Sequence, residues 1–293
     1  MRVLLVILFQ FIFCTVSFSQ QYELMGVLKF NTTSMISYRL LFTEENGKVV
    51  GYSITDLQGE NETKNRIEGT YNIKTKIFSF SEKEIEYTKS KVTQADFCYV
   101  HFKGKFVLGD KSTLKGKFTG LFKNNATCVN GSLHLVATVK MSQKIAKTTK
   151  KLQKSKKVDA ASKEKLNLNK VLDSLKTNLL RSNEITSVYL NSNEVELELW
   201  DAGQEDGDRV TVYADDKILL NNYEIKREKK KIKLSLLTGE SAIKIVALNV
   251  GTIAPNTAMI AIKGTDKTIE LQSNLDKNNF TIIKVIRKNQ NDK

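Results

Sequence analysis

The sequence predicts an all-β protein built from two antiparallel β-domains, and three observations support this fold class. Apolar and polar residues alternate over many short runs, which is typical of half-buried strands. Polar segments rich in Asn, Thr and Ser separate these runs and favour turns. The chain holds one proline in 293 residues, and its apolar fraction of 41% is sufficient for packed cores. This length predicts two domains of ordinary size.

The first predicted domain covers residues 20–139 and consists of eight or nine antiparallel strands. Ile36, Tyr38 and Leu40 alternate with their neighbours, and a turn at Asn46 leads into the next run. Glycines alternate with large residues over positions 114–122, which lets a sheet curve or lets aromatic rings pack across it. The pattern predicts an antiparallel β-barrel or sandwich. Both a filled interior and a ligand cavity, as in a lipocalin, are compatible with it.

Residues 140–183 form a lysine-rich linker with a short helix. Eleven lysines lie between Lys140 and Lys170 against two acidic residues, so this window carries +9 of the net charge of +14. A solvated linker is the simpler interpretation, and attraction to lipid head groups or acidic polysaccharide is the alternative. The window has no Arg and no aromatic residue, which argues against a nucleic-acid partner. Leucines and a valine recur at three- and four-residue spacing further on, which predicts an amphipathic helix over residues 163–181. They are Leu168, Val171, Leu172, Leu175, Leu179 and Leu180.

Residues 184–293 are predicted to form the second β-domain. Val195, Leu197 and Leu199 alternate with glutamates, which gives the strand one buried and one wet face. Roughly eight such runs follow one another at the 8–12-residue spacing of an immunoglobulin-like β-sandwich. The basic run at residues 226–231 predicts an exposed sheet edge rather than a binding patch.

Residues 1–19 have the pattern of a secretory signal peptide. Arg2 precedes an apolar run over residues 3–13, and Ser17 and Ser19 form a small-residue cleavage site. The run is shorter than the roughly 20 residues needed to cross a bilayer. Lipidation of Cys14 is disfavoured because the bulky Phe13 precedes it. We therefore expect an exported chain, in the periplasm or outside the cell, with no transmembrane segment after cleavage.

Cys98 and Cys128 are the two cysteines that remain after cleavage, and in an exported chain they are expected to form a disulfide. Closing a loop of about thirty residues would stabilise the fold by roughly 3–4 kcal/mol on the chain-entropy model. The chain has only two histidines. It also has no recognisable nucleophile motif or phosphate loop, so we expect no enzymatic activity.

Four carboxylates lie within eight residues after Trp200, and they are the candidate metal ligands of the chain. Ca²⁺ binds hard oxygen ligands, and the glycine within the loop permits a tight turn. A solvated hairpin turn is the alternative, because the spacing departs from the EF-hand pattern and Asp-Gly is a common turn pair. Trp200 is a candidate stacking face for a ligand. The carboxylates are those of Asp201, Glu205, Asp206 and Asp208.

Residues 199–213 and 245–262 resemble a module found in many exported proteins of Bacteroidota-type bacteria. These segments run from Leu-Trp-Asp-Ala-Gly-Gln-Glu-Asp-Gly-Asp to Val-Thr-Val-Tyr, and from Ile-Val-Ala-Leu-Asn-Val-Gly-Thr to Pro-Asn-Thr-Ala. The signal peptide, which ends in Phe18-Ser19, is similar to those of the same bacterial group. The resemblance implies an exported immunoglobulin-like β-sandwich and assigns no catalytic residue. It does not extend to the N-terminal domain.

Together these features predict an exported, non-enzymatic binding or structural protein of the bacterial envelope or cell surface. Its expected partner is an envelope or surface component, either protein or polysaccharide, and its only candidate cofactor is calcium. The alternative function is carbohydrate binding supported by calcium at the acidic loop. The sequence leaves the ligand and the oligomeric state open.

Overall fold

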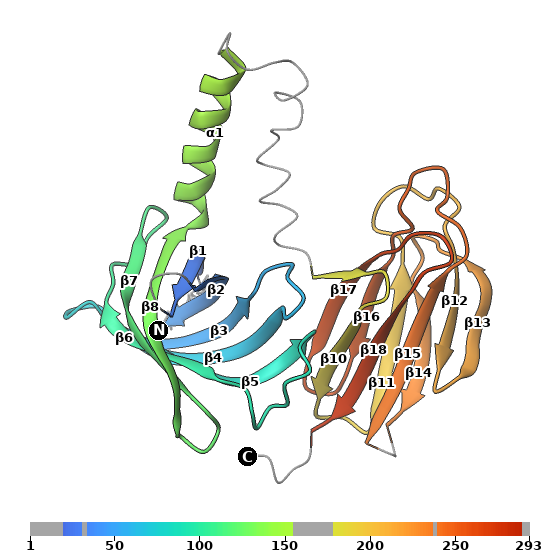
Figure 1. The fold of residues 1–293 in the computed structure, drawn as a ribbon, viewed down its shortest axis with the longest axis horizontal. Coiled ribbons are helices and arrows are strands. Elements are labelled where there is room, and N and C mark those ends of the chain that lie inside the picture. Colours follow the sequence, from blue (N-terminus) through green and yellow to red (C-terminus); the bar gives the residue numbers. More distant parts are fainter. Residues whose placement is uncertain (1–19, 31–33, 155–177, 237–238, 289–293) are drawn as a thin grey trace, which may run out of the picture.

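A computed structural model describes residues 20–30, 34–154, 178–236 and 239–288. Strands dominate the described chain, and one helix projects from it (Figure 1). The protein is therefore all-β, as the alternating pattern predicts. It consists of an N-terminal barrel and a C-terminal pair of facing sheets.

The N-terminal strands close into an eight-stranded antiparallel barrel. Each strand pairs with its neighbours in the order β5-β4-β3-β2-β1-β8-β7-β6, and β6 pairs back with β5 to complete the circle. Of the two architectures that the sequence allows, the barrel is the one observed. The strands are β1 (Gln21–Lys29), β2 (Met35–Glu45), β3 (Lys48–Thr55), β4 (Thr63–Asn72), β5 (Ile77–Thr88), β6 (Tyr99–Lys105), β7 (Thr113–Leu121) and β8 (Thr127–Ala137).

Aromatic side chains occupy the barrel interior. The ring centroid of Phe78 lies 5.0 Å from that of Phe42 and 5.4 Å from that of Phe106. Phe102 packs against glycine backbone: a Cβ atom placed on Gly116 would lie 2.7 Å from its ring. The glycine alternation in β7 thus makes room for a ring on a neighbouring strand, as the sequence pattern predicts.

Helix α1 (Thr138–Lys154) continues β8 without a break and extends away from the barrel (Figure 1). The first lysines of the expected linker therefore lie on a helix that the sequence did not predict at this position, although most of them are exposed to solvent. The helix expected over residues 163–181 is wrong where it can be tested, because Leu179–Arg181 form strand β9 and residues 163–177 lie outside the described chain. Leu180 is fully buried in the sandwich core, so its apolar character reflects strand packing.

The C-terminal domain packs two sheets face to face around one apolar core (Figure 1). One sheet has the order β13-β12-β15-β18-β10, and the other β14-β11-β16-β17-β9. Most neighbours are antiparallel, whereas β10 with β18 and β9 with β17 are parallel. The remaining strands are β10 (Ile185–Leu190), β11 (Glu194–Trp200), β12 (Arg209–Ala214), β13 (Lys217–Glu224), β14 (Lys230–Ser235), β15 (Glu240–Ala247), β16 (Met259–Lys263), β17 (Thr268–Asn274) and β18 (Phe280–Arg287).

Strand β10 joins the two domains into one continuous sheet. It pairs with β18 on one side and, through Ser187 and Val188, with Thr88 and Tyr87 of β5 on the other. Barrel and sandwich therefore share a thirteen-stranded sheet. Backbone hydrogen bonds, and not a linker alone, set their relative position.

Candidate functional site

The acidic loop lies between β11 and β12 at one end of the sandwich, and its carboxylates accept backbone hydrogen bonds. Asp201 Oδ1 accepts the Gly203 amide at 2.6 Å, which tightens the start of the loop. Glu205 Oε1 accepts the Arg227 amide at 2.6 Å. These two side chains therefore contact the loop itself and the segment before β14.

Asp206 and Asp208 contact a different segment, the connection between β15 and β16. Asp206 Oδ2 accepts the Ile253 amide at 3.1 Å, and Asp208 Oδ2 accepts the Thr257 amide at 2.8 Å. One oxygen of each carboxylate is thus fixed by backbone. The structure brings these two candidate ligands to the same pair of loops and directs Glu205 elsewhere.

Asn256 completes this group, and the sequence analysis did not single it out as a site residue. Its side chain is fully buried, and Nδ2 donates to the carbonyl oxygens of Asn249 at 3.0 Å and Arg209 at 3.3 Å. It follows a cis bond between Ala254 and Pro255. The signal that pointed to it was the Pro-Asn-Thr-Ala segment of the resembling module.

Three oxygens of this group have no hydrogen-bond partner although solvent does not reach them. They are Asp206 Oδ1, Asp208 Oδ1 and Asn256 Oδ1. Burial above all, together with the negative charges of Asp206 and Asp201, raises the pKa of Asp208 to about 6, although the hydrogen bond from the Thr257 amide lowers it. The group therefore concentrates negative charge in a desolvated place.

The predicted calcium ligands are only partly gathered. Within the described ranges, no three His, Cys, Asp or Glu side chains are placed together for a metal ion. Asn and Gln side chains also offer oxygen ligands. Asp206, Asp208 and Asn256 therefore form a mixed group of two carboxylates and one amide.

Trp200, the candidate stacking residue, is covered on its ring by a lysine. Lys229 Nζ lies 4.1 Å from the ring centroid and 3.1 Å from Glu198 Oε2. A sugar ring would have to displace this ammonium group to stack on that face. Lys229 precedes β14, which is an edge strand, in agreement with the exposed edge expected for the basic run.

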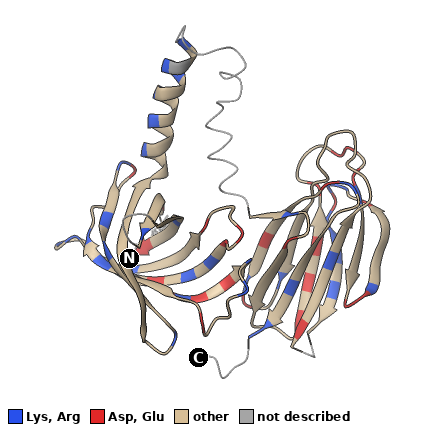
Figure 2. Ribbon diagram, in the orientation of Figure 1, with Lys and Arg blue, Asp and Glu red and all other residues tan. Residues whose placement is uncertain are grey.

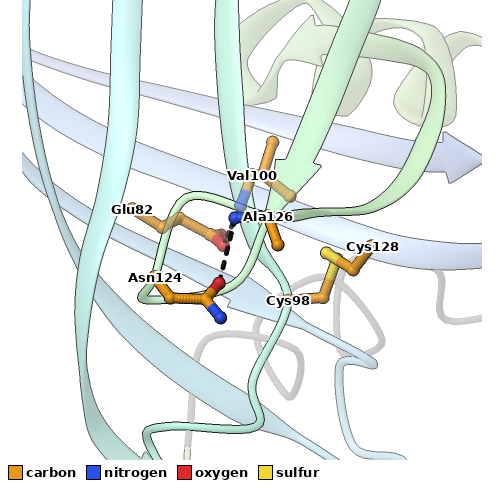
Figure 3. Close-up of a disulfide and its surroundings, with 6 residues drawn as sticks. All are labelled: Glu82, Cys98, Val100, Asn124, Ala126 and Cys128. Carbon is orange, nitrogen blue, oxygen red and sulfur yellow. Dashed lines mark hydrogen bonds between the residues drawn. A yellow bond between two sulfur atoms is a disulfide. The ribbon is translucent and has the colours of Figure 1, made fainter.

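Cys98 and Cys128 form a disulfide, as the sequence predicts, with their Cα atoms 6.0 Å apart (Figure 3). The bond joins the segment before β6 to the start of β8. Beside it, Glu82 Oε2 accepts the Val100 amide at 2.7 Å, just beyond the point where the ladder between β5 and β6 ends. The carboxylate thus satisfies an amide that this ladder leaves unpaired.

A buried ion cluster lies at the joint between the domains and was not predicted. Lys89 Nζ donates to the Leu179 carbonyl at 2.6 Å and lies 3.1 Å from Glu184 Oε2 and 4.0 Å from Glu62 Oε1. Its side chain is 2% exposed. Tyr87 donates to Glu62 at 3.1 Å and to Asn178 at 2.7 Å. Lys89 and Tyr87 of the barrel thus bind the first residues of the sandwich domain.

Comparisons with known proteins give no further identification. No family model, curated protein or solved structure matches the chain. In the part of the chain that the structure describes, no helix is long and apolar enough to cross a membrane.

Proposed function

We propose that the protein is an exported, non-enzymatic binding protein of a bacterial envelope or cell surface that presents helix α1 to an anionic polysaccharide. The observation that carries this proposal is the composition of α1, which has six lysines and no acidic or aromatic residue. Basic colour alone marks the helix as it leaves the barrel (Figure 2). The signal-peptide pattern and the disulfide support export.

The lysines of α1 form a row along the helix. Lys140, Lys144 and Lys147 are spaced by four and three residues, and Lys151 and Lys154 continue the spacing, which places them on one face. Lys140 Nζ donates to Thr113 Oγ1 at 2.9 Å, whereas the other four are exposed. Like charges at these spacings destabilise a helix by about 0.2–0.5 kcal/mol per pair. An anionic partner removes that repulsion.

A polysaccharide fits this row better than a membrane does. Helices that lie in a bilayer interface combine basic residues with Trp, Phe or Leu that enter the acyl region. The described part of α1 presents no aromatic side chain, and Met141 and Ile145 are only partly exposed. Val139 is 44% exposed, but it lies at the barrel end of the helix, before the exposed lysines. From Lys144 to Lys154 the row spans about 15 Å at the helical rise, which suits several charged sugars of one extended chain.

The two β-domains serve as the support for this helix. The shared sheet and the ion cluster at Lys89 hold the barrel and the sandwich together. Helix α1 is therefore attached to a support formed by both domains. A rigid support of this kind is expected of a structural or binding protein, because such a protein needs no conformational change to act.

Binding of the mature protein to polygalacturonate, measured by calorimetry at low and high salt, tests the proposal. Reversing Lys144, Lys147 and Lys151 to Glu should weaken binding at least 10-fold, because the row is lost. Reversing Lys217, Lys226 and Lys233, which are exposed on the sandwich, changes the net charge equally and should have little effect.

Three outcomes would contradict the proposal. Equal losses in both triple variants would show that net charge alone attracts the polymer. Binding to vesicles with anionic lipid but not to the polysaccharide would assign α1 to a membrane surface. A hydrolytic activity that one carboxylate substitution abolishes would make the protein an enzyme.

A further inference from the structure

We propose that a divalent cation of the calcium type binds between the acidic loop and the connection from β15 to β16, held by Asp206, Asp208 and Asn256. This site goes beyond the proposed function and stands independently of helix α1. It differs from the ligand set that the sequence predicts, because Asp201 and Glu205, which accept amide hydrogen bonds from Gly203 and Arg227, are excluded and Asn256 is added.

The first argument is the set of buried oxygens without partners. Asp208 and Asn256 are 2% and 0% exposed, and each keeps one side-chain oxygen unbonded. Asp206 Oδ1 is likewise out of solvent and unbonded. Buried acceptors are nearly always satisfied in folded proteins, so three in one place indicate a missing partner.

The second argument is that the three side chains lie between the same two chain segments. Asp208 Oδ2 is bonded to the amide of Thr257, the residue that follows Asn256. Asn256 Nδ2 is bonded to the carbonyl of Arg209, the residue that follows Asp208. Asp206 reaches the same connection through Ile253. The side chains of Asp208 and Asn256 therefore cross between the same two short segments.

The third argument is charge. The basic residues nearest in the chain are engaged elsewhere: Arg209 pairs with Glu224 at 2.8 Å, and Arg227 donates to the Gly203 carbonyl at 3.1 Å. Among the described residues, no lysine or arginine forms an ion pair with Asp206 or Asp208. Asp208 is buried and Asp206 is half-buried. Desolvated carboxylates without a counter-ion are costly, and a bound cation supplies the missing charge.

The fourth argument is the donor type and its orientation. The donors are carboxylate and amide oxygens, which suit Ca²⁺, and no thiolate or imidazole is present to favour zinc. The second atom of each group is already fixed by a backbone hydrogen bond, as outer-shell contacts fix the ligands of metal sites. Backbone carbonyls and water would complete the coordination.

Calcium titration of the full mature chain tests the site, after treatment with chelator. We expect one equivalent to bind by calorimetry with an affinity in the 10⁻⁴–10⁻³ M range typical of extracellular modules. At 10 mM CaCl₂, the midpoint of thermal unfolding should rise by roughly 4–8 °C, because only the folded state binds.

Substitutions separate this site from general acidity of the loop. Asp208→Asn keeps the volume and should weaken calcium binding at least 10-fold, and Asp206→Asn should do the same. Glu205→Gln is the matched control, since Glu205 is exposed and bonded to Arg227, and it should bind calcium as the wild type does.

The proposal is overturned if the wild-type chain binds no calcium at 10 mM, which would leave buried water as the partner of these oxygens. It is also overturned if Glu205→Gln lowers the affinity and the two Asp variants do not. If Asp208→Asn fails to fold, Asp206→Asn and the wild-type titration still decide the outcome.

Discussion

Two buried glutamates, one in the barrel and one in the sandwich, have opposite environments. Glu82 lies inside the barrel and accepts hydrogen bonds from Tyr38 at 2.8 Å, from Ser53 at 2.5 Å and from a backbone amide. Burial raises its pKa, and these donors offset only part of the effect. Glu198 lies on a sandwich sheet beneath lysines, and hydrogen bonding from Lys263 above all lowers its pKa to about 2.

The comparison shows that the pKa of a buried carboxylate depends on the charge of the groups around it, and not on burial alone. Both residues are nearly unexposed, at 2% and 1%. Glu82 is surrounded by neutral donors, whereas three ammonium groups cover Glu198. The joint between the domains is an intermediate case: burial raises the pKa of Glu62 although Lys89 lowers it.

The largest effect is expected at the joint, where removal of the lysine should leave the buried Glu62 without its cation and the half-buried Glu184 with only Arg181. Lys89→Met should destabilise the protein by about 3–5 kcal/mol, as breaking buried ion pairs does. Urea unfolding measures this loss of stability. Trp200 fluorescence monitors the sandwich, and circular dichroism monitors the whole protein.

We also expect the two unfolding signals to separate in this variant, because the sandwich loses its attachment to the barrel. Lys83→Met is the control, since Lys83 is exposed on β5, and it should stay within about 0.5 kcal/mol of the wild type. A Lys89 variant as stable as this control would show that the joint is not held by charge.

A smaller effect is expected inside the barrel. Glu82→Gln should cost about 1–3 kcal/mol at pH 7, because the new amide group faces the Val100 N–H and leaves that donor unpaired. The raised pKa means that the folded state binds the proton more tightly than the unfolded chain.

The wild type should therefore lose stability as the pH rises from 4.5, the ordinary pKa of a glutamate, through the folded-state pKa of Glu82. Glu82→Gln should remove the part of this slope that Glu82 contributes. Urea unfolding at a series of pH values measures both. An identical slope in the variant would contradict the raised pKa.

The smallest effect is expected at Glu198, and its pH dependence has the opposite sign. Its lowered pKa contributes stability that is present above 4.5, the ordinary pKa of a glutamate, and is lost as the pH falls towards about 2. Glu198→Gln should thus be less sensitive to acid than the wild type. At pH 7 it should cost only about 1 kcal/mol, because the side chains of Lys229, Lys231 and Lys263 are 43%, 57% and 35% exposed and solvent screens their attraction to Glu198. If acid sensitivity were unchanged in this variant, the lysines would not control the charge of Glu198.

Most of the fold was predictable, because alternation marks strands directly. Closure of the barrel was not, since it depends on the pairing of β5 with β6, and a sandwich would show the same alternation. Helix α1 was not predicted because its sequence is dominated by lysines and its apolar stripe is short. Leu180 was assigned to a helix because a buried parallel strand shows no apolar–polar alternation.

The site was predictable only in part. The Cys98–Cys128 pair followed from compartment and count. Asp206 and Asp208 were recognised as candidate ligands. Asn256 lies about fifty residues further along the chain, and its only signal was the Pro-Asn-Thr-Ala segment of the resembling module, which assigns it no role. Glu184 is likewise far from Lys89 in sequence, so no local pattern could show that the two meet at the joint.

The shared sheet also protects the newly made chain. Strand β5 pairs with β6 only from Ile77 to Ser81, and β10 covers its far end at Tyr87 and Thr88. Tyr87 and Thr88 pair with β4 on one side, but until residues 185–190 have been synthesised their other edge has no strand beside it, and such edges promote association between chains. A fragment that stops after Lys154 would expose this edge, which the sandwich covers in the full chain.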